Sequence, residues 1–309
     1  MITIYKSSET GLITLDQHTS GSWINVVNPT AQELDDLQQL GIPSDYLTYP
    51  LDLDERARTE RENGEVLIVL RIPYYQGQSV DIPYTTLPLG IVMSEEYVLT
   101  ISRFENELTR EMISGRLKNL MTHKRNRFVL RILLATATKY LTYLREITKA
   151  VDILEDQLQQ STRNKEVLEL LKYQKSLTHF STALKSNELM MERLHRSRIF
   201  QTYPDDEDLL EDVLTENQQA IEMNSITSNI LSSMMDAFAS IISNNLNGVM
   251  KFLASITILL SLPSLLASFF GMNVHLPFEN TPQAFLLIIL ICVLIGAIAA
   301  YIFWKRDWF

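Results

Sequence analysis

Two long apolar runs lie near the carboxyl end of this 309-residue chain. The first covers residues 252–270 and the second covers residues 284–304, and neither contains a charged residue. At about 1.5 Å per residue in a helix, each run reaches roughly 30 Å, the thickness of the hydrocarbon core of a bilayer. The pattern therefore predicts two membrane spans joined by a short loop at residues 271–283.

The charges that flank the two runs predict their orientation. Lys251 precedes the first run, Lys305 and Arg306 follow the second, and the connecting loop has neither lysine nor arginine. Positive flanks stay on the cytoplasmic side. We therefore expect a multi-pass protein of the cell (inner or plasma) membrane, with both termini in the cytoplasm, a basic cytoplasmic tail at residues 305–309 and an outer loop.

Small and hydroxylated side chains form one stripe along the first run. They recur every three or four residues, the spacing at which side chains share a helix face, at Ala254, Thr257, Ser261, Ser264 and Ser268. Such a stripe suits close helix packing in a membrane, and it also suits the wall of a water-filled pore. One stripe cannot enclose a pore, so the second interpretation requires several copies of the chain around an axis.

Residues 1–127 have the patterns of a mixed α/β domain. The capping box that starts at Thr30 predicts a helix that ends near Gly41. Short β-branched and apolar runs predict strands at Ile2–Tyr5, Leu12–Leu15, Ser22–Val27, Glu65–Tyr75, Thr85–Met93 and Tyr97–Ser102. We expect this segment to be a cytoplasmic α/β domain.

Helical periodicity replaces the strand pattern after residue 127. Apolar residues recur with nearly heptad spacing up to Leu158, a break follows, and a second helix is predicted from Lys165 to about residue 198. We expect an antiparallel, coiled-coil-like hairpin over residues 128–204. A third helix is expected to run through residues 205–251 into the first membrane run, which gives an α+β fold with a membrane hairpin at its end.

Acidic residues dominate that third helix. The chain has 27 Lys+Arg and 37 Asp+Glu, a formal net charge of −10, and no Lys or Arg lies between Arg198 and Lys251. The helix dipole favours acids in the first turn but does not explain the lack of cations beyond it. In a symmetric assembly the carboxylates repeat as rings, which attract cations and offer oxygen ligands to Mg²⁺. A merely solvated acidic face is the alternative.

The chemistry-bearing motifs of enzymes are missing from the sequence. It has no G-x-S-x-G, no H-E-x-x-H, no dinucleotide fingerprint and no GxxxxGK[ST] loop. We expect neither an enzyme nor a nucleic-acid partner. A membrane-anchored scaffold or signalling protein without conductance stays open as a function of another class.

The tripeptide Gly271-Met272-Asn273 lies directly after the first apolar run. Together with Asn247-Gly248-Val249-Met250-Lys251 upstream and the closing Lys305-Arg306, this layout resembles the CorA family of divalent-cation channels. The resemblance implies a funnel-shaped homopentamer with a cytoplasmic α/β part, in which the first span lines the pore. The partners it implies are further copies of the chain, divalent cations and the lipid bilayer.

The resemblance also implies roles for particular residues. Asn273 would ring the outer mouth and bind hydrated Mg²⁺, while Gly271 and Met272 shape the turn of this selectivity filter. Asp212 would bind regulatory Mg²⁺ between subunits, with Asp81 of the neighbouring domain as its partner. With Thr257 from the stripe, the pore-lining set is Asp236 at the inner entrance, Asn247, Met250 and Leu253 at an apolar gate, Thr257, Ser261 and Ser264. Mg²⁺ is thus expected as both the transported and the regulatory ion.

Some residues depart from the family pattern. Phe270 stands where tyrosine is usual, Ser261 replaces a larger residue, and Glu279 is the loop's one acid. Influx of Mg²⁺, with Co²⁺ or Ni²⁺ as further ions, is the first hypothesis, and a Zn²⁺ transporter of the ZntB branch is the second. Zn²⁺ favours His and Cys ligands, and the five histidines form no H-x₃-H cluster; they are His18, His123, His179, His195 and His275.

Overall fold

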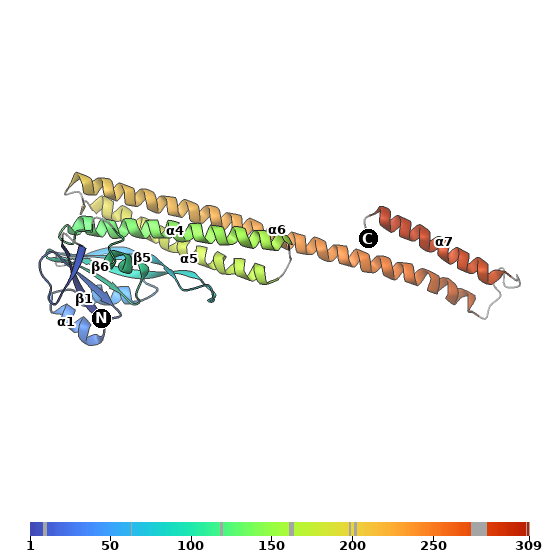
Figure 1. The fold of residues 1–309 in the computed structure, drawn as a ribbon, viewed down its shortest axis with the longest axis horizontal. Coiled ribbons are helices and arrows are strands. Elements are labelled where there is room, and N and C mark those ends of the chain that lie inside the picture. The colour runs from blue at the N-terminus through green and yellow to red at the C-terminus, as the bar shows by residue number, and fades with distance from the viewer. Residues whose placement is uncertain are drawn as a thin grey trace. The chain divides into compact units, whose positions relative to one another are not determined.

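The computed structural model describes residues 1–8, 11–62, 64–117, 120–160, 164–197, 199–200, 203–272, 283–306 and 308. The chain divides into two compact units, Met1–Met235 and Asp236–Phe309. Figure 1 follows the chain from the sheet of the first unit to α7 of the second. The fold is α+β, with two apolar helices at its carboxyl end.

A seven-stranded sheet forms the centre of the first unit, with the order β2-β1-β3-β7-β6-β5-β4. The pairing of β3 with β7 is parallel and the other pairings are antiparallel. The strands are β1 (Ile2–Ser8), β2 (Gly11–Leu15), β3 (Ser22–Val27), β4 (Arg58–Glu62), β5 (Glu65–Tyr75), β6 (Tyr84–Met93) and β7 (Tyr97–Ser102). The six predicted strands are confirmed, and β4 was not predicted.

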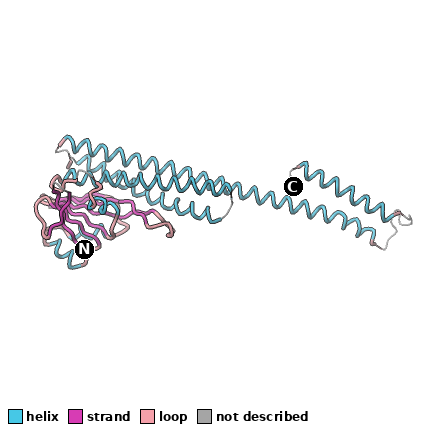
Figure 2. Tube along the Cα trace, viewed as in Figure 1, coloured by secondary structure: helices cyan, strands magenta, loops and turns pink. Residues whose placement is uncertain are grey.

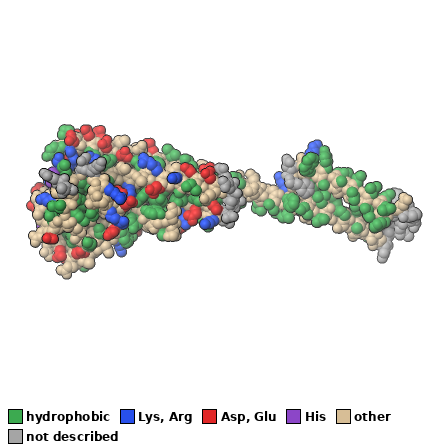
Figure 3. Space-filling model, viewed as in Figure 1, with side chains coloured by type: hydrophobic (Ala, Val, Ile, Leu, Met, Phe, Trp, Pro, Cys, Tyr) green, Lys and Arg blue, Asp and Glu red, His purple; other side chains and the backbone are tan. Residues whose placement is uncertain are grey.

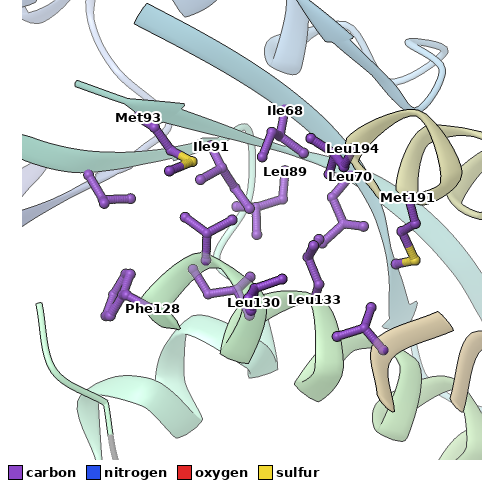
Figure 4. Close-up of a cluster of buried hydrophobic side chains, with 14 of the residues drawn as sticks. Ile68, Leu70, Leu89, Ile91, Met93, Phe128, Leu130, Leu133, Met191 and Leu194 are labelled. Atoms are coloured by element: carbon purple, nitrogen blue, oxygen red, sulfur yellow. The ribbon is translucent and has the colours of Figure 1, made fainter. Parts of the chain in front are cut away.

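Both faces of the sheet are covered, and the alternation along β5 explains how. Ile68 and Leu70 point to one face, whereas Leu67 and Val69 point to the other, as a period of two requires. The first face packs against α3 (Glu107–Ile113), α4 (Arg125–Gln160), α5 (Asn164–Ser197) and the start of α6 (Pro204–Phe270). Figure 4 shows Leu130 and Leu133 of α4 facing Leu89 and Leu70 of the sheet.

The opposite face of the sheet packs against short helices. These are α1 (Ala31–Gln38), α2 (Ser44–Thr48) and the 3₁₀ turn η1 (Tyr49–Leu51), and Figure 2 shows the sheet between them and the long helices. The predicted capping box is present: Thr30 Oγ1 accepts from Glu33 N (3.3 Å), and Glu33 Oε2 accepts from Thr30 N (2.8 Å). A Cβ at Gly90 would lie 2.2 Å from Pro50 Cγ, so only glycine lets η1 approach β6 this closely.

Polar side chains of α5 complete the edge of β5 where β4 has ended. The β4 pairing runs only to Val69, and beyond it the backbone of Arg71 has no strand partner on that side. The Asn187 amide replaces the missing strand: its Oδ1 accepts from Arg71 N (2.9 Å) and its Nδ2 donates to Arg71 O (2.8 Å). Asn187 is fully buried, so these bonds hold α5 in register with the sheet.

The long helices α4, α5 and the first part of α6 lie side by side in the first unit (Figure 1). Asn217 Nδ2 of α6 donates to Leu184 O of α5 (3.4 Å), and the hydroxyls of Thr148 in α4 and Thr227 in α6 are 3.2 Å apart. Buried apolar side chains such as Val213 and Leu231 complete these contacts. The expectation of long packed helices after the α/β domain is therefore confirmed.

The second unit holds the end of α6 and the helix α7 (Ala284–Lys305). Both helices are long and apolar enough to cross a membrane. At most 6% of the most apolar 18-residue stretch of each helix is buried within the chain. Figure 3 shows charged side chains over the first unit and mostly apolar or uncharged ones over the second. The two predicted apolar helices are thus present, with their side chains exposed.

Candidate functional site

The side of α6 that faces α7 is the half-buried side of the apolar stretch. Ser255 is fully buried, and partly buried side chains follow it at Leu259, Leu262, Pro263 and Leu266. Pro263 lines a groove of about 620 Å³ together with Ile288 and Cys292 of α7, so this side carries the contact between the two helices.

The predicted stripe lies on the opposite side of α6. At roughly 100° per residue, Thr257, Ser261 and Ser264 point away from the side that holds Ser255 and Leu259. All five stripe positions are exposed: Ala254, Thr257, Ser261, Ser264 and Ser268. Packing of the stripe against α7, the close-packing interpretation within one chain, is therefore excluded.

Three hydroxyls of the stripe donate their hydrogens to the helix backbone. Thr257 Oγ1 donates to Leu253 O (2.8 Å), Ser261 Oγ to Ile258 O (3.0 Å) and Ser264 Oγ to Leu260 O (3.1 Å). Because a hydroxyl has one hydrogen and two lone pairs, the outward surface of each oxygen offers acceptors. Water molecules around a cation present hydrogens, so this surface matches a hydrated cation and not an anion.

The remaining positions assigned to the pore lie along the same side of α6. Asp236, Asn247, Met250 and Leu253 are exposed, and Met250 and Leu253 have 57% and 52% of their surface accessible. The α-helix ends at Phe270. The N–H of Gly271 then donates to Ala267 O (3.1 Å) and that of Met272 to Phe269 O (3.3 Å). Asn273, His275 and Glu279 lie outside the described residues.

Arg127 of α4 compensates the first acids of α6. Its Nε donates to Asp206 Oδ1 (2.8 Å) and its Nη2 to Asp205 Oδ2 (3.2 Å). Asp206 is buried and Asp205 is exposed, and the hydrogen bond with Asp206 raises the pKa of Arg127. The sequence shows no cation between Arg198 and Lys251, but the fold supplies one to the start of α6 from 79 positions away. The carboxylates of Asp212 and Asp236 remain exposed.

The two carboxylates assigned to regulatory Mg²⁺ do not meet within one chain. Asp81 Oδ2 is 2.6 Å from Lys175 Nζ of α5, and the neighbouring Gln174 bonds Ser232 of α6. Ser232 and Asp212 are separated by about 20 residues of helix, or roughly 30 Å. No group of three or more His, Cys, Asp or Glu that could hold a metal occurs in the part of the chain that the structure describes. A site built on Asp81 and Asp212 therefore requires two chains.

Comparisons with known proteins point to one family. A family model described as CorA-like Mg²⁺ transporter protein matches residues 19–306. The cobalt/magnesium transport protein CorA of Methanocaldococcus jannaschii is 29% identical over 298 residues, which are 93% of this chain and 90% of that protein.

Solved structures give the same result. The complete CorA magnesium transporter from Methanocaldococcus jannaschii matches with a TM-score of 0.87 and 26% identity, over 100% of this chain and 99% of that chain. The ZntB cytoplasmic domain from Vibrio parahaemolyticus matches with a TM-score of 0.61 over 78% of this chain and 98% of that domain. Its identity is 10%, so this second likeness is one of fold alone.

The ion pair between Arg127 and Asp206 predicts unequal effects for two adjacent substitutions. Asp206→Ala leaves Arg127 without its buried partner, and unpaired charges near the interior are costly. We expect a lower unfolding temperature of the full-length protein in detergent. Asp205→Ala, which removes the same charge from an exposed position, should cause a much smaller change. Equal unfolding temperatures for the two variants would contradict this role for Asp206.

Proposed function

The chain belongs to the CorA-like Mg²⁺ transporter family, and from this premise we propose that it is a Mg²⁺ influx channel driven by the membrane potential. Members of this family are membrane transporters and not enzymes. Co²⁺ is a second proposed cargo, because the relative from Methanocaldococcus jannaschii is a cobalt/magnesium transport protein. Ni²⁺ is a third proposed cargo, as in the hypothesis drawn from the sequence.

One observation carries the proposal of a pore. The polar stripe on α6 is exposed on the side opposite α7, and its hydroxyl oxygens offer acceptors outward. Several chains placed around an axis would bring these stripes together, and we propose five copies, as the family resemblance implies. Each chain would contribute residues 252–270 to the pore and 284–304 as the outer span, with the basic tail in the cytoplasm.

Selectivity is assigned to Asn273, with Gly271 and Met272 forming the turn that presents it. Mg²⁺ loses its water reluctantly, and a ring of neutral amides can bind the hydrated ion weakly enough to release it. The inside-negative potential then supplies about 2.3 kcal/mol per elementary charge per 100 mV, acting on both charges of the ion. Met250 and Leu253 would form the apolar constriction that closes the path.

Regulation is assigned to Asp212 and Asp81 of neighbouring subunits. Cytoplasmic Mg²⁺ bound between them would cancel the repulsion between acidic chains, each with a formal net charge of −10, and hold the constriction shut. When Mg²⁺ inside the cell falls, the carboxylates would repel and the assembly would loosen. Asp236 would attract cations at the inner entrance.

No specific observation favours the other candidates. The likeness to a ZntB cytoplasmic domain is one of fold, and the described residues hold no His or Cys cluster suited to Zn²⁺. A scaffold without conductance would give no reason for an exposed stripe of acceptors in an apolar helix.

Ion flux in proteoliposomes tests the channel and its filter. With a potential negative inside, we expect the protein to carry Mg²⁺ to an enclosed Mg²⁺-sensitive dye, and Asn273→Ala to reduce the initial rate at least tenfold, because the amide ring is lost. Asn229→Ala, at an exposed position of α6 in the first unit, is the matched control and should keep the wild-type rate. Wild-type flux in Asn273→Ala would contradict the assignment of Asn273 to the filter. If neither the wild type nor the variants carried Mg²⁺, the channel proposal would be wrong.

Thiol labelling tests which side of α6 meets water. In a Cys292→Ser chain, we expect Ser261→Cys to react with a membrane-impermeant thiosulfonate and to lose Mg²⁺ flux on reaction, because the added charge would stand in the pore. Ser255→Cys is the matched control on the buried side and should stay unlabelled. Labelling of Ser255→Cys but not Ser261→Cys would place the pore elsewhere.

Internal Mg²⁺ tests the regulatory carboxylate. We expect Asp212→Ala to raise the internal Mg²⁺ concentration that halves the flux by several-fold, because one ligand of the inhibitory ion is removed. Asp152→Ala removes an exposed carboxylate from α4 and should leave the inhibition curve in place. The regulatory role would be refuted by identical inhibition curves for Asp212→Ala and the wild type.

A further inference from the structure

A pocket in the first unit is lined by residues that have no place in the proposed cation pathway. It lies where α4 and α6 begin, has a volume of about 690 Å³, and is lined by Lys124, Arg125, Arg127, Tyr203 and Asp205 among others. Its size falls within the range of pockets that hold small organic ligands. None of these residues belongs to the proposed pore or to the Asp81 and Asp212 pair.

The charge of this pocket is opposite to that of the protein. The chain has ten more acidic than basic residues, yet three cations occur within four positions here, at Lys124, Arg125 and Arg127. Arg127 forms ion pairs with Asp205 and Asp206, the two acids of the lining. Three cations against two carboxylates leave the lining with a net charge of +1.

Lys124 and Arg125 have no carboxylate partner among the described residues. Lys124 is exposed, and the guanidinium of Arg125 donates to the backbone oxygen of Ser94, which fixes its position without removing its charge. Other cations of the unit do have carboxylate partners, as Lys175 has in Asp81 and Arg196 in Glu192. Two unpaired cations, one held in place, form a site for an anion with several oxygens.

An aromatic side chain completes the lining. Tyr203 precedes the first residue of α6, and 62% of its surface is exposed although it is large and apolar over most of its area. Exposed aromatic rings beside cations are the combination that binds nucleotides, because the ring stacks on the base while the cations bind phosphate. An inorganic anion would leave the ring unused.

We propose that this pocket binds a nucleoside triphosphate, with its phosphates on Lys124 and Arg125 and its base stacked on Tyr203. This ligand is an anion of the cytoplasm and is separate from the transported cation. Tyr203 and Pro204 lead directly into α6, so the bound nucleotide would contact the start of the helix that also carries the polar stripe.

Calorimetric titration of the full-length protein in detergent tests this site. ATP is added in buffer with EDTA, so that no divalent cation contributes. We expect saturable binding of one ATP per chain at submillimolar concentration and at least tenfold weaker binding to Lys124→Glu, because the phosphates then meet a carboxylate. Lys165→Glu makes the same charge change at an exposed position of α5 and should bind as the wild type does. Unfolding temperatures of both variants confirm that each is folded.

A second set of variants tests the contact between the base and Tyr203. Tyr203→Ala should weaken ATP several-fold and leave tripolyphosphate unchanged, while Tyr203→Phe should bind ATP as the wild type does, since the ring is kept. The site is refuted if ATP gives no saturable heat with the wild type, or if Lys124→Glu and Lys165→Glu bind equally. Equal affinity of the wild type for ATP and tripolyphosphate would refute a nucleotide as the ligand.

Discussion

The main constraint on this structure is that the apolar surface of its two carboxyl-terminal helices must be covered, because the chain itself leaves most of that surface exposed. In the first unit, α6 buries one face against α4 and α5 through side chains such as Val213 and Leu231. Among the described residues of the second unit the same helix contacts only α7, and side chains such as Leu260 and Leu265 are 69% and 57% exposed. At about 25 cal/mol per Å² of apolar surface, two such helices cannot remain in water. Lipid and, in the proposed assembly, further copies of the chain are the surfaces that can cover them.

The sequence predicted those features that arise from neighbouring residues. The two apolar helices follow from composition, the capping box from the four positions from Thr30 to Glu33, and the strands from alternation. Strand β4, Arg58–Glu62, was missed because its sequence RTERE has no apolar alternation. Among the described strands it pairs with β5 alone, at the edge of the sheet. Charged side chains are common on edge strands because they prevent pairing with other chains.

Features made by distant residues could not be predicted. Nothing local indicates that Asn187 replaces a strand beside Arg71, or that Arg127 reaches Asp206, since both contacts join positions far apart in the chain. The same limit applies to the candidate site. Periodicity placed Thr257, Ser261 and Ser264 on one face of a helix, but only the position of α7 excludes that face from the contact within the chain. Nothing local in the sequence indicated that Asp81 pairs with Lys175.

The distribution of acids along α6 fits conduction of a strongly hydrated ion. Between Asp236 and Glu279 the chain has no Asp or Glu, so carboxylates end before the membrane begins. A carboxylate within the span would be costly to bury and would hold a divalent ion too firmly to release it. Hydroxyls whose hydrogens are already donated to the helix offer weaker, neutral acceptors. In the proposed channel the arrangement would separate two tasks: charge would gather cations in the cytoplasmic part, and neutral oxygens would let them pass the membrane.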